Sequence, residues 1–252
     1  MLSINTDYKK LETRIDTHKQ YSTHNINNWI ISCVSPHKEV KLLDIGCGTG
    51  EQLVLFGKTC GPDSFIVGID ESEESLQIAK QKCLENNLQK LKTIRGSMDT
   101  LDTLLGNLKN FDIVISCFAL YYSKNIPKLI SNINKILSSQ GKFFVCGPVT
   151  GNNAELIDFQ SQIAKSPIKT MPYPITETIL PEILKIFSNV SKFYFSNSIR
   201  FPDTLSMIKY WKAYYLYDAS IKEEFTLKIV EHFKKQKEFI CTKKVLGIVA
   251  SQ

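Results

Sequence analysis

Short apolar runs alternate with amphipathic stretches along the first 148 residues of the chain. Each apolar run has the length of a buried strand, and the runs fall at 40–45, 64–70, 90–95, 111–116 and 141–147. Helical spacing of apolar positions marks the stretches between them, at 51–58, 72–86, 100–107 and 125–138. This alternation predicts an α/β fold with parallel strands joined by right-handed helical crossovers.

The two ends of the chain add further elements. Apolar positions recur at helical spacing within 8–34, which predicts two helices, with Ser22 and Thr23 available to cap the second. The proline-rich segment after residue 148 breaks the regular alternation. Beyond it the pattern predicts helices at 153–165 and 176–188 and strands at 190–200 and 239–249.

Residues 203–217 carry a cluster of aromatic side chains. A helix there places Met207, Trp211, Tyr214 and Tyr215 on one broad face. Core packing is the usual fate of such a face. The alternative is the wall of a ligand pocket, because Trp and Tyr combine apolar area with a polar atom. Trp211 and Tyr215 are the candidates for that wall.

A glycine-rich turn connects the first predicted strand with the first helix of the alternating region. Gly46, Gly48 and Gly50 stand at alternate positions, with Cys47 between the first two. Glycine adopts backbone angles that other residues resist, and it lets a ligand approach the main chain closely. A strand, a glycine turn and a helix N-terminus together form a nucleotide-type binding loop.

The charges around this turn narrow the choice of ligand. A dinucleotide fingerprint requires glycine where the chain has Glu51. Glu51 and Asp44 place negative charge where a pyrophosphate would bind, which disfavours a dehydrogenase. The turn therefore fits a ligand with cationic groups and no phosphate, such as S-adenosylmethionine (AdoMet), with its sulfonium and ammonium groups.

The sequence Leu-Asp-Ile-Gly-Cys-Gly-Thr-Gly at 43–50 resembles the first motif of class I AdoMet-dependent methyltransferases of the small-molecule type. The resemblance extends over residues 41–148, where the motifs follow one another in the order and at the spacing of the family. It implies AdoMet as cofactor and a Rossmann-like, seven-stranded, mostly parallel sheet with helices on both faces and helical lid elements. The last strand, at 239–249, is antiparallel in the resembled fold.

The resemblance also implies cofactor contacts at successive strand ends. Asp70 would accept hydrogen bonds from the ribose hydroxyls, although it could instead cap a helix; Ser72 is a ready alternative cap. Asp99 would accept from the adenine amino group, cap the following helix, or do both. The candidate cofactor-binding residues in the core are Asp44, Gly46, Cys47, Gly48, Gly50, Asp70, Glu71, Ser97, Met98, Asp99, Ser116, Cys117 and Phe118.

The N-terminal segment resembles the lid of many small-molecule methyltransferases. Arg14 is expected to bind the AdoMet carboxylate, with Tyr21 as a second cofactor contact. His18 has the ordinary pKa of a general base at neutral pH. A plain surface position is the alternative for each of these residues.

Two tyrosines after the fourth core strand are expected to face the methyl acceptor. Tyr121 and Tyr122 are substrate-binding candidates, and Tyr122 is also a catalytic candidate; packing roles are the alternative. Many members of the resembled family carry histidine at the place of Tyr122, so a histidine base from this loop is in doubt. The chain also lacks an Asn/Asp-Pro-Pro-Tyr motif, which counts against nucleobase and glutamine side-chain acceptors.

Composition places limits on partners and location. The net charge is +6, but the lysines are spread among acids, so nucleic acid is disfavoured as a partner. Seven widely spaced cysteines give no metal-binding pattern. No apolar run approaches membrane-span length, and the first ten residues lack a signal-peptide core. We expect a cytoplasmic protein without a membrane partner, as a monomer or a homodimer.

The expected domain organisation follows from these elements. An N-terminal helical lid at 1–35 precedes the AdoMet-binding core at 36–148, an acceptor-site lid at 149–235 and a final core strand at 236–252. The expected function is methyl transfer from AdoMet to an O, N or C nucleophile of a small-molecule acceptor. An RNA-directed methyltransferase and a non-catalytic, methyltransferase-like binding subunit are the alternatives.

Overall fold

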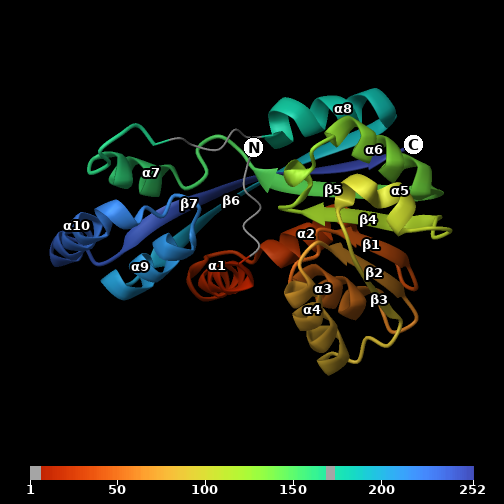
Figure 1. Cartoon of the computed structure of the whole chain (residues 1–252), viewed down its shortest axis with the longest axis horizontal. Coiled ribbons are helices and arrows are strands. Elements are labelled where there is room, and N and C mark those ends of the chain that lie inside the picture. The colour runs from red at the N-terminus through yellow and green to blue at the C-terminus, as the bar shows by residue number, and fades with distance from the viewer. Residues whose placement is uncertain (1–6, 169–173) are drawn as a thin grey trace.

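The computed structural model describes residues 7–168 and 174–252. A seven-stranded sheet with strand order β3-β2-β1-β4-β5-β7-β6 runs through its centre (Figure 1). Every neighbouring pair is parallel except the two pairs that contain β7, so the predicted mostly parallel sheet is confirmed. The strands are β1 (Lys41–Ile45), β2 (Phe65–Asp70), β3 (Leu91–Arg95), β4 (Phe111–Cys117), β5 (Leu137–Pro148), β6 (Asn189–Phe201) and β7 (Phe239–Ser251).

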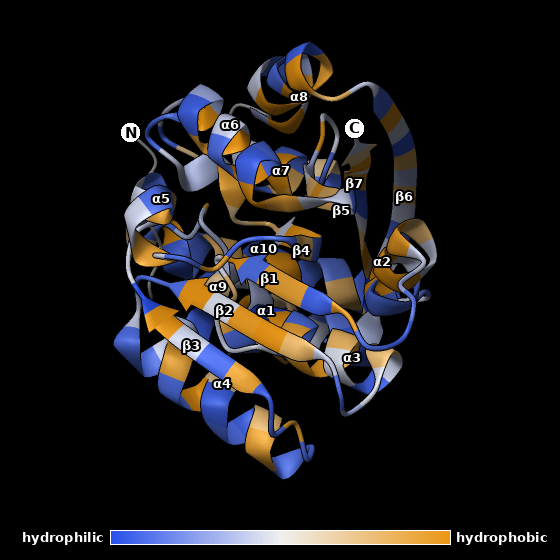
Figure 2. Cartoon of the chain, turned by 90° about the vertical axis from the view of Figure 1, so that its right-hand side faces the viewer, coloured by the Kyte–Doolittle hydropathy of each residue, from blue (hydrophilic) through white to orange (hydrophobic). Residues whose placement is uncertain are grey.

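Helices cover both faces of the sheet, as the alternating sequence pattern predicts. Helices α2 to α4 lie on one face of the sheet, and α5, α6 and α8 lie on the other (Figure 1). Each set of helices packs over one apolar cluster. Strand β2 is mostly hydrophobic, whereas α4 alternates between hydrophobic and hydrophilic positions (Figure 2). These helices are α2 (Ile26–Val34), α3 (Glu51–Cys60), α4 (Glu73–Glu85), α5 (Leu101–Leu104), α6 (Ile126–Ile136) and α8 (Leu180–Ile186).

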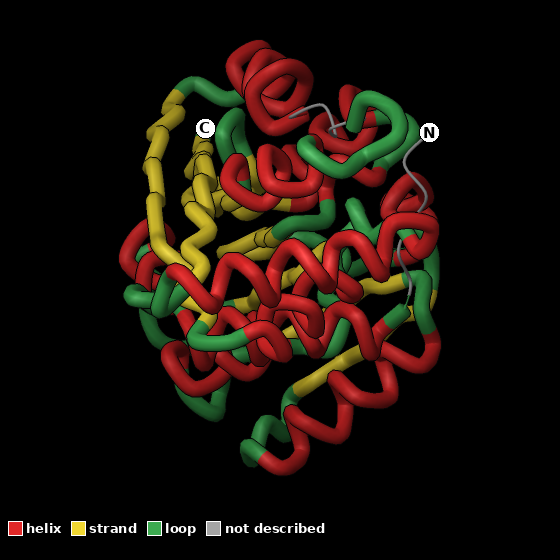
Figure 3. The backbone as a smooth tube through the Cα atoms, turned by 90° about the vertical axis from the view of Figure 1, so that its left-hand side faces the viewer, coloured by secondary structure: helices red, strands yellow, loops and turns green. Residues whose placement is uncertain are grey.

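The two longest strands extend beyond the rest of the sheet. Strand β7 pairs with β5 only from Val245 onward, but it pairs with β6 from Phe239. The extension therefore passes the carboxyl edge of the parallel strands, and it supports a third apolar cluster (Figure 3). The helices around the extension are α1 (Tyr8–Tyr21), α7 (Ala154–Ser161), α9 (Thr204–Ala213) and α10 (Lys222–Lys235).

Several predicted helix ends were wrong by a few residues. The helix expected at 100–107 is a 3₁₀ turn, Met98–Thr100, followed by α5, which ends at Leu104; Gly106 then takes a left-handed conformation with φ +55°. Helix α9 ends at Ala213 rather than 217, because Tyr214 is extended. Helix α7 ends at Ser161 rather than 165.

The cap of α2 is Asn25, whose side chain accepts from the backbone N–H of Asn27, rather than Ser22 or Thr23. The parts of the two predicted lids at 1–6 and 169–173 lie outside the described residues. Within 7–168 and 174–252, no helix has both the length and the apolar character needed to cross a membrane.

Candidate active site

A cavity of about 640 Å³ lies at the carboxyl edge of the parallel strands, under α1. Its wall includes the glycine turn, the ends of β2 and β4, and residues from α1, α9 and the extension of β7. Ligands of open α/β sheets bind at this edge, and the volume suits a small-molecule site. The cavity therefore lies where the sequence predicted a cofactor.

The glycine turn is held in place by both neighbours of β1. The backbone N–H groups of Gly46 and Cys47 donate to the carbonyl of Ile69, at 2.8 and 3.0 Å. Gly46 has φ +76°, and a Cβ there would lie 2.3 Å from the Cβ of Ala119. This glycine is thus required both by the backbone turn and by close packing of the loop after β4.

Two residues of the predicted cofactor set lie behind the cavity wall. A Cβ on Gly50 would lie 2.8 Å from that of Ala79 in α4, so this glycine allows helix packing rather than ligand approach. Asp44 is 2% exposed, and its Oδ2 has no hydrogen-bond partner. Burial, with the charge of Asp70, raises the pKa of Asp44 to about 8. Neither Asp44 nor Gly50 lines the cavity.

Asp70 lines the cavity and also fixes the glycine turn. Its Oδ2 accepts from the N–H of Gly48 at 2.8 Å, and its Oδ1 accepts from the N–H of Ser72 at 2.9 Å. The side chain of Ser72 caps α4. A carboxylate has about four acceptor positions, so Asp70 retains capacity for a ligand's hydroxyl groups.

The loop after β3 forms the far end of the cavity. Ser97, Met98 and Asp99 all line it, as does Glu71. Asp99 Oδ1 accepts from the hydroxyl of Ser123 at 2.5 Å, and both carboxylate oxygens accept from the N–H of Lys124 at 3.1 Å. The predicted adenine-binding residues therefore lie together, with Asp99 held by the loop that follows β4.

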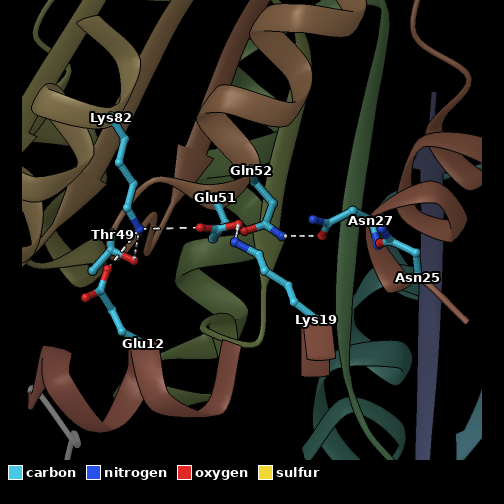
Figure 4. A network of polar contacts seen from close by, with 8 residues as sticks. All are labelled: Glu12, Lys19, Asn25, Asn27, Thr49, Glu51, Gln52 and Lys82. Carbon is cyan, nitrogen blue, oxygen red and sulfur yellow. Dashed lines mark hydrogen bonds and ion pairs between the residues drawn. The ribbon is translucent and has the colours of Figure 1, made fainter. Parts of the chain in front are cut away.

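Helix α1 is tied across the glycine turn by a network of charges (Figure 4). Lys19 lies 2.8 Å from Glu51, and Lys82 lies 2.9 Å from Glu12 and 3.4 Å from Glu51. Burial alone would raise the pKa of Glu51, but Lys19 and Lys82 hold that pKa below its ordinary value. The acid at the start of α3 is thus ion-paired with two lysines.

The loop after β4 carries the predicted acceptor-facing residues. Phe118 has φ +58°, an uncommon conformation for a residue with a side chain, and its N–H donates to Cys146 at 2.9 Å. The rings of Tyr121 and Tyr122 lie 4.8 Å apart, and both residues line the cavity with Cys117. Burial raises the pKa of Tyr122, so its hydroxyl stays protonated at neutral pH.

Arg14 and His18 both line the cavity from α1. The guanidinium of Arg14 donates to the carbonyl of Ala213 at 2.7 Å, which docks α1 on the end of α9. His18 Nε2 lies 3.4 Å from Nζ of Lys243, whereas His18 Nδ1 is buried without a partner. Burial, Lys243 and Arg14 hold the pKa of His18 well below its ordinary value, so the ring is neutral.

Three predicted site residues point away from the cavity. Trp211 is fully buried, stacks on Phe225 at 3.8 Å between ring centroids, and donates to Gln160 at 2.8 Å. The hydroxyl of Ser116 donates to the carbonyl of Ile45 at 2.8 Å inside the sheet. Tyr21 packs against Phe201 in the third apolar cluster. Trp211, Ser116 and Tyr21 therefore do not line the cavity.

The structure adds cavity residues that the sequence did not single out. Lys243 is one, and the buried residues Tyr210, Asn153 and Asn197 are others. A signal for Lys243 was present in the sequence. Strand β7 alternates, and Lys243 stands on its inward face between the buried residues Cys241 and Val245. A lysine on an otherwise apolar strand face marks a special position.

The fold and the cavity define an α/β protein that binds its ligand at a glycine turn on the carboxyl edge. A family model described as a methyltransferase domain matches residues 36–240. The chain belongs to this methyltransferase domain family.

Known proteins resemble the chain in sequence over part of its length and in fold over most of it. It is 31% identical over 116 residues to a ubiquinone biosynthesis O-methyltransferase of Pelagibacter ubique, covering 46% of the chain and 45% of that protein. The chain thus spans about half the length of the curated relatives it matches.

Two solved structures share the fold. The YcgJ protein of Bacillus subtilis matches with a TM-score of 0.61 and 13% identity, over 90% of this chain and 97% of that one. The geranyl diphosphate C-methyltransferase of Streptomyces coelicolor, solved with S-adenosyl-L-homocysteine, matches with a TM-score of 0.52 and 12% identity, over 90% and 75%. At sequence identities this low, the similarity shows a shared fold and nothing about function.

Proposed function

We propose that the chain transfers a methyl group from AdoMet to an O, N or C nucleophile of a small-molecule acceptor. One observation carries the proposal: a single cavity joins the acidic strand ends at Asp70 and Asp99 to the aromatic loop at Tyr121 and Tyr122. A donor and an acceptor would meet in such a cavity. Membership of the methyltransferase domain family supports the same reaction.

The residues at the donor end fit AdoMet. Asp70 has free acceptor capacity for the two ribose hydroxyls, and Asp99 lines the same cavity as the proposed acceptor for the adenine amino group. Gly46 and Gly48 line the cavity, and the carboxylate of Asp70 at the N–H of Gly48 disfavours a phosphate there. Arg14 has further N–H donors for the AdoMet carboxylate beyond the one that it gives to Ala213.

The chemistry demands little from the protein beyond position. AdoMet, when bound, supplies an electrophilic methyl group on a sulfonium. The cavity has to hold the acceptor nucleophile about 3–3.5 Å from that carbon, in line with the sulfur. Tyr121 and Tyr122 offer neutral hydroxyl groups that orient the acceptor, and α1 excludes water.

His18 remains the candidate base only under one condition. Its neutral ring has one lone pair, and Nε2 faces Lys243. With Lys243 as the donor, Nδ1 carries the ring proton, so neither ring nitrogen is free to accept a proton from the acceptor. A base role would require Lys243 to release Nε2, and it is needed only for an acceptor that binds protonated.

Thermal melting with AdoMet, S-adenosylhomocysteine and NAD tests the proposal. Ligand at 100 times its Kd adds about 2.7 kcal/mol of stability, which is a rise of roughly 5–10 °C for a chain of this size. We expect a rise with the first two ligands only. A rise with NAD alone would indicate a dehydrogenase, and no rise would favour a non-catalytic binding subunit.

The proposal also covers the acceptor side of the cavity, the location of the protein and its oligomeric state. The acceptor side is formed by α1, residues from 149–235 and β7, in a cytoplasmic monomer or homodimer without a membrane or nucleic-acid partner. An RNA-directed enzyme is the second candidate. Release of S-adenosylhomocysteine with small-molecule acceptors, and its absence with bulk RNA, separates the two.

A further inference from the structure

The acceptor end of the cavity contains a lysine without an acid to balance it. Lys243 lines the cavity, and its Nζ contacts Nε2 of His18 at 3.4 Å and the ring of Phe118 at 4.6 Å from the centroid. Among the described residues, no carboxylate forms an ion pair with Lys243. A cation withdrawn from water is costly unless an anion pairs with it.

His18 adds a second unsatisfied donor at the same place. Because Nε2 accepts from Lys243, Nδ1 carries the proton of the neutral ring. Nδ1 is sealed from solvent and has no hydrogen-bond partner. Buried polar groups are nearly always paired, so the unpaired Nδ1–H of His18, a residue that lines the cavity, is a donor left available to a ligand that reaches it.

Charge is distributed unevenly along the cavity. Its lining acids, Glu51, Asp70, Glu71 and Asp99, belong to the glycine turn and the ends of β2 and β3. At that end Lys19 pairs with Glu51, and the backbone N–H of Lys124 donates to Asp99. Arg14 and Lys243, which come from α1 and β7, form no ion pair among the described residues. A ligand that spans the cavity would therefore be complementary if it were anionic at the α1 and β7 end.

We propose that Lys243 and His18 form a binding subsite for a carboxylate of the methyl acceptor. The inference rests on the proposed methyl transfer. Strand β7 is separated from β1 by β4 and β5 in the sheet, so Lys243 stands on the acceptor side of the glycine turn. Phe118, Tyr121 and Tyr122 beside it provide flat apolar walls, which suit an aromatic or unsaturated acid.

Paired ligands that differ only in charge test the subsite. Benzoate and 4-hydroxybenzoate are compared with benzamide and 4-hydroxybenzamide, at millimolar concentration and with saturating S-adenosylhomocysteine. The proteins are the wild type, Lys243→Met and the control Lys244→Met, whose lysine is exposed on the same strand. Melting and calorimetry give the affinities.

We expect the acids to bind the wild type and Lys244→Met at least tenfold more tightly than the amides. Lys243→Met should lose that preference while it keeps its melting shift with S-adenosylhomocysteine. Equal binding of acids and amides by the wild type, or no binding of any acid, overturns the subsite. Loss of the S-adenosylhomocysteine shift in Lys243→Met would mean that Lys243 binds the cofactor carboxylate, and the proposal fails.

The same experiment separates failure of the subsite from failure of the proposed function. A wild type that shows no shift with S-adenosylhomocysteine contradicts methyl transfer, whatever the acids do. A wild type that shifts with S-adenosylhomocysteine but does not prefer acids contradicts the subsite alone.

Discussion

Nζ of Lys243 lies 3.4 Å from Nε2 of His18, although 225 residues separate the two in the sequence. The contact joins the extension of β7 to α1, the helix that closes the cavity. It places a neutral histidine in the cavity wall beside a lysine that has no carboxylate partner among the described residues. The pairing determines the protonation of His18 and marks the proposed acceptor subsite.

Replacement of Lys243 by methionine is expected to stabilise the ligand-free protein at neutral pH. Burial, with Arg14 nearby, lowers the pKa of Lys243 from 10.5 to about 8, so the folded state carries a desolvation penalty below pH 8. Between about pH 8 and 10.5 the unfolded chain binds more protons, and wild-type stability rises relative to the variant. The groups that face Lys243 are His18 and Arg14 of α1 and Cys146 of β5.

We expect the free energy of unfolding of Lys243→Met to exceed that of the wild type by about 1–3 kcal/mol at pH 7. The difference should shrink as the pH rises from 8 to 10. Urea unfolding at a series of pH values measures it. A difference that does not change with pH would show that the pKa of Lys243 is the same in the folded and the unfolded protein.

Replacement of Asp70 by alanine is expected to weaken AdoMet binding by about 10–100-fold, because hydrogen bonds to a charged group contribute about 1.5–3 kcal/mol. Asp70 also holds the N–H of Gly48, so the ligand-free melting temperature should fall slightly. Calorimetric titration measures the affinity, with Asp63→Ala as an exposed acidic control. Unchanged affinity would remove Asp70 from the cofactor site.

Replacement of Tyr122 by phenylalanine is expected to lower kcat by about 5–10-fold, because one hydrogen bond to the acceptor is lost. The affinity for AdoMet should stay within about twofold of the wild-type value. The reason is its place on the acceptor loop, away from the glycine turn. Steady-state kinetics and cofactor titration are compared, with the exposed Tyr194→Phe as control. An equal loss in both quantities would make Tyr122 a packing residue.

Replacement of Lys19 by alanine is expected to loosen α1 over the glycine turn. Lys19 and Glu51 form a partly exposed pair, and such pairs contribute about 0.2–1 kcal/mol, so the Kd of AdoMet should rise by about 1.5–5-fold. The wild-type Kd should rise with salt more than that of the variant. Lys58→Ala, exposed on the same helix as Glu51, is the control. Equal salt dependence would contradict a role for this pair in closure.

Replacement of Gly46 by alanine is expected to destabilise the fold by about 2 kcal/mol or more, because the new Cβ would overlap Ala119. Gly106→Ala is the matched control. Gly106 also has positive φ, but nothing lies within 4 Å of the added Cβ, so only backbone strain of about 1 kcal/mol is expected. Equal loss in denaturant unfolding of the two variants would mean that the contact with Ala119 relaxes freely.

The difference between Trp211 and Tyr215 shows where local patterns stop being informative. Helical spacing placed both on one face, but α9 ends at Ala213, so Tyr215 lies beyond the helix and lines the cavity while Trp211 faces the core. The end of a helix depends on what packs around it. Here the extension of β6 and β7 and the neighbouring α10 decide it.

The sequence by itself determined the features that depend on neighbouring residues. Strand and helix periodicity predicted the parallel core, the glycine turn identified the binding edge, and the family resemblance implied Asp70 and Asp99 at successive strand ends. Only the tertiary structure decided the acceptor end. Lys243 meets His18 because β7 passes the edge of the sheet and α1 folds back over it, and contacts between such distant segments are set by packing rather than by local pattern.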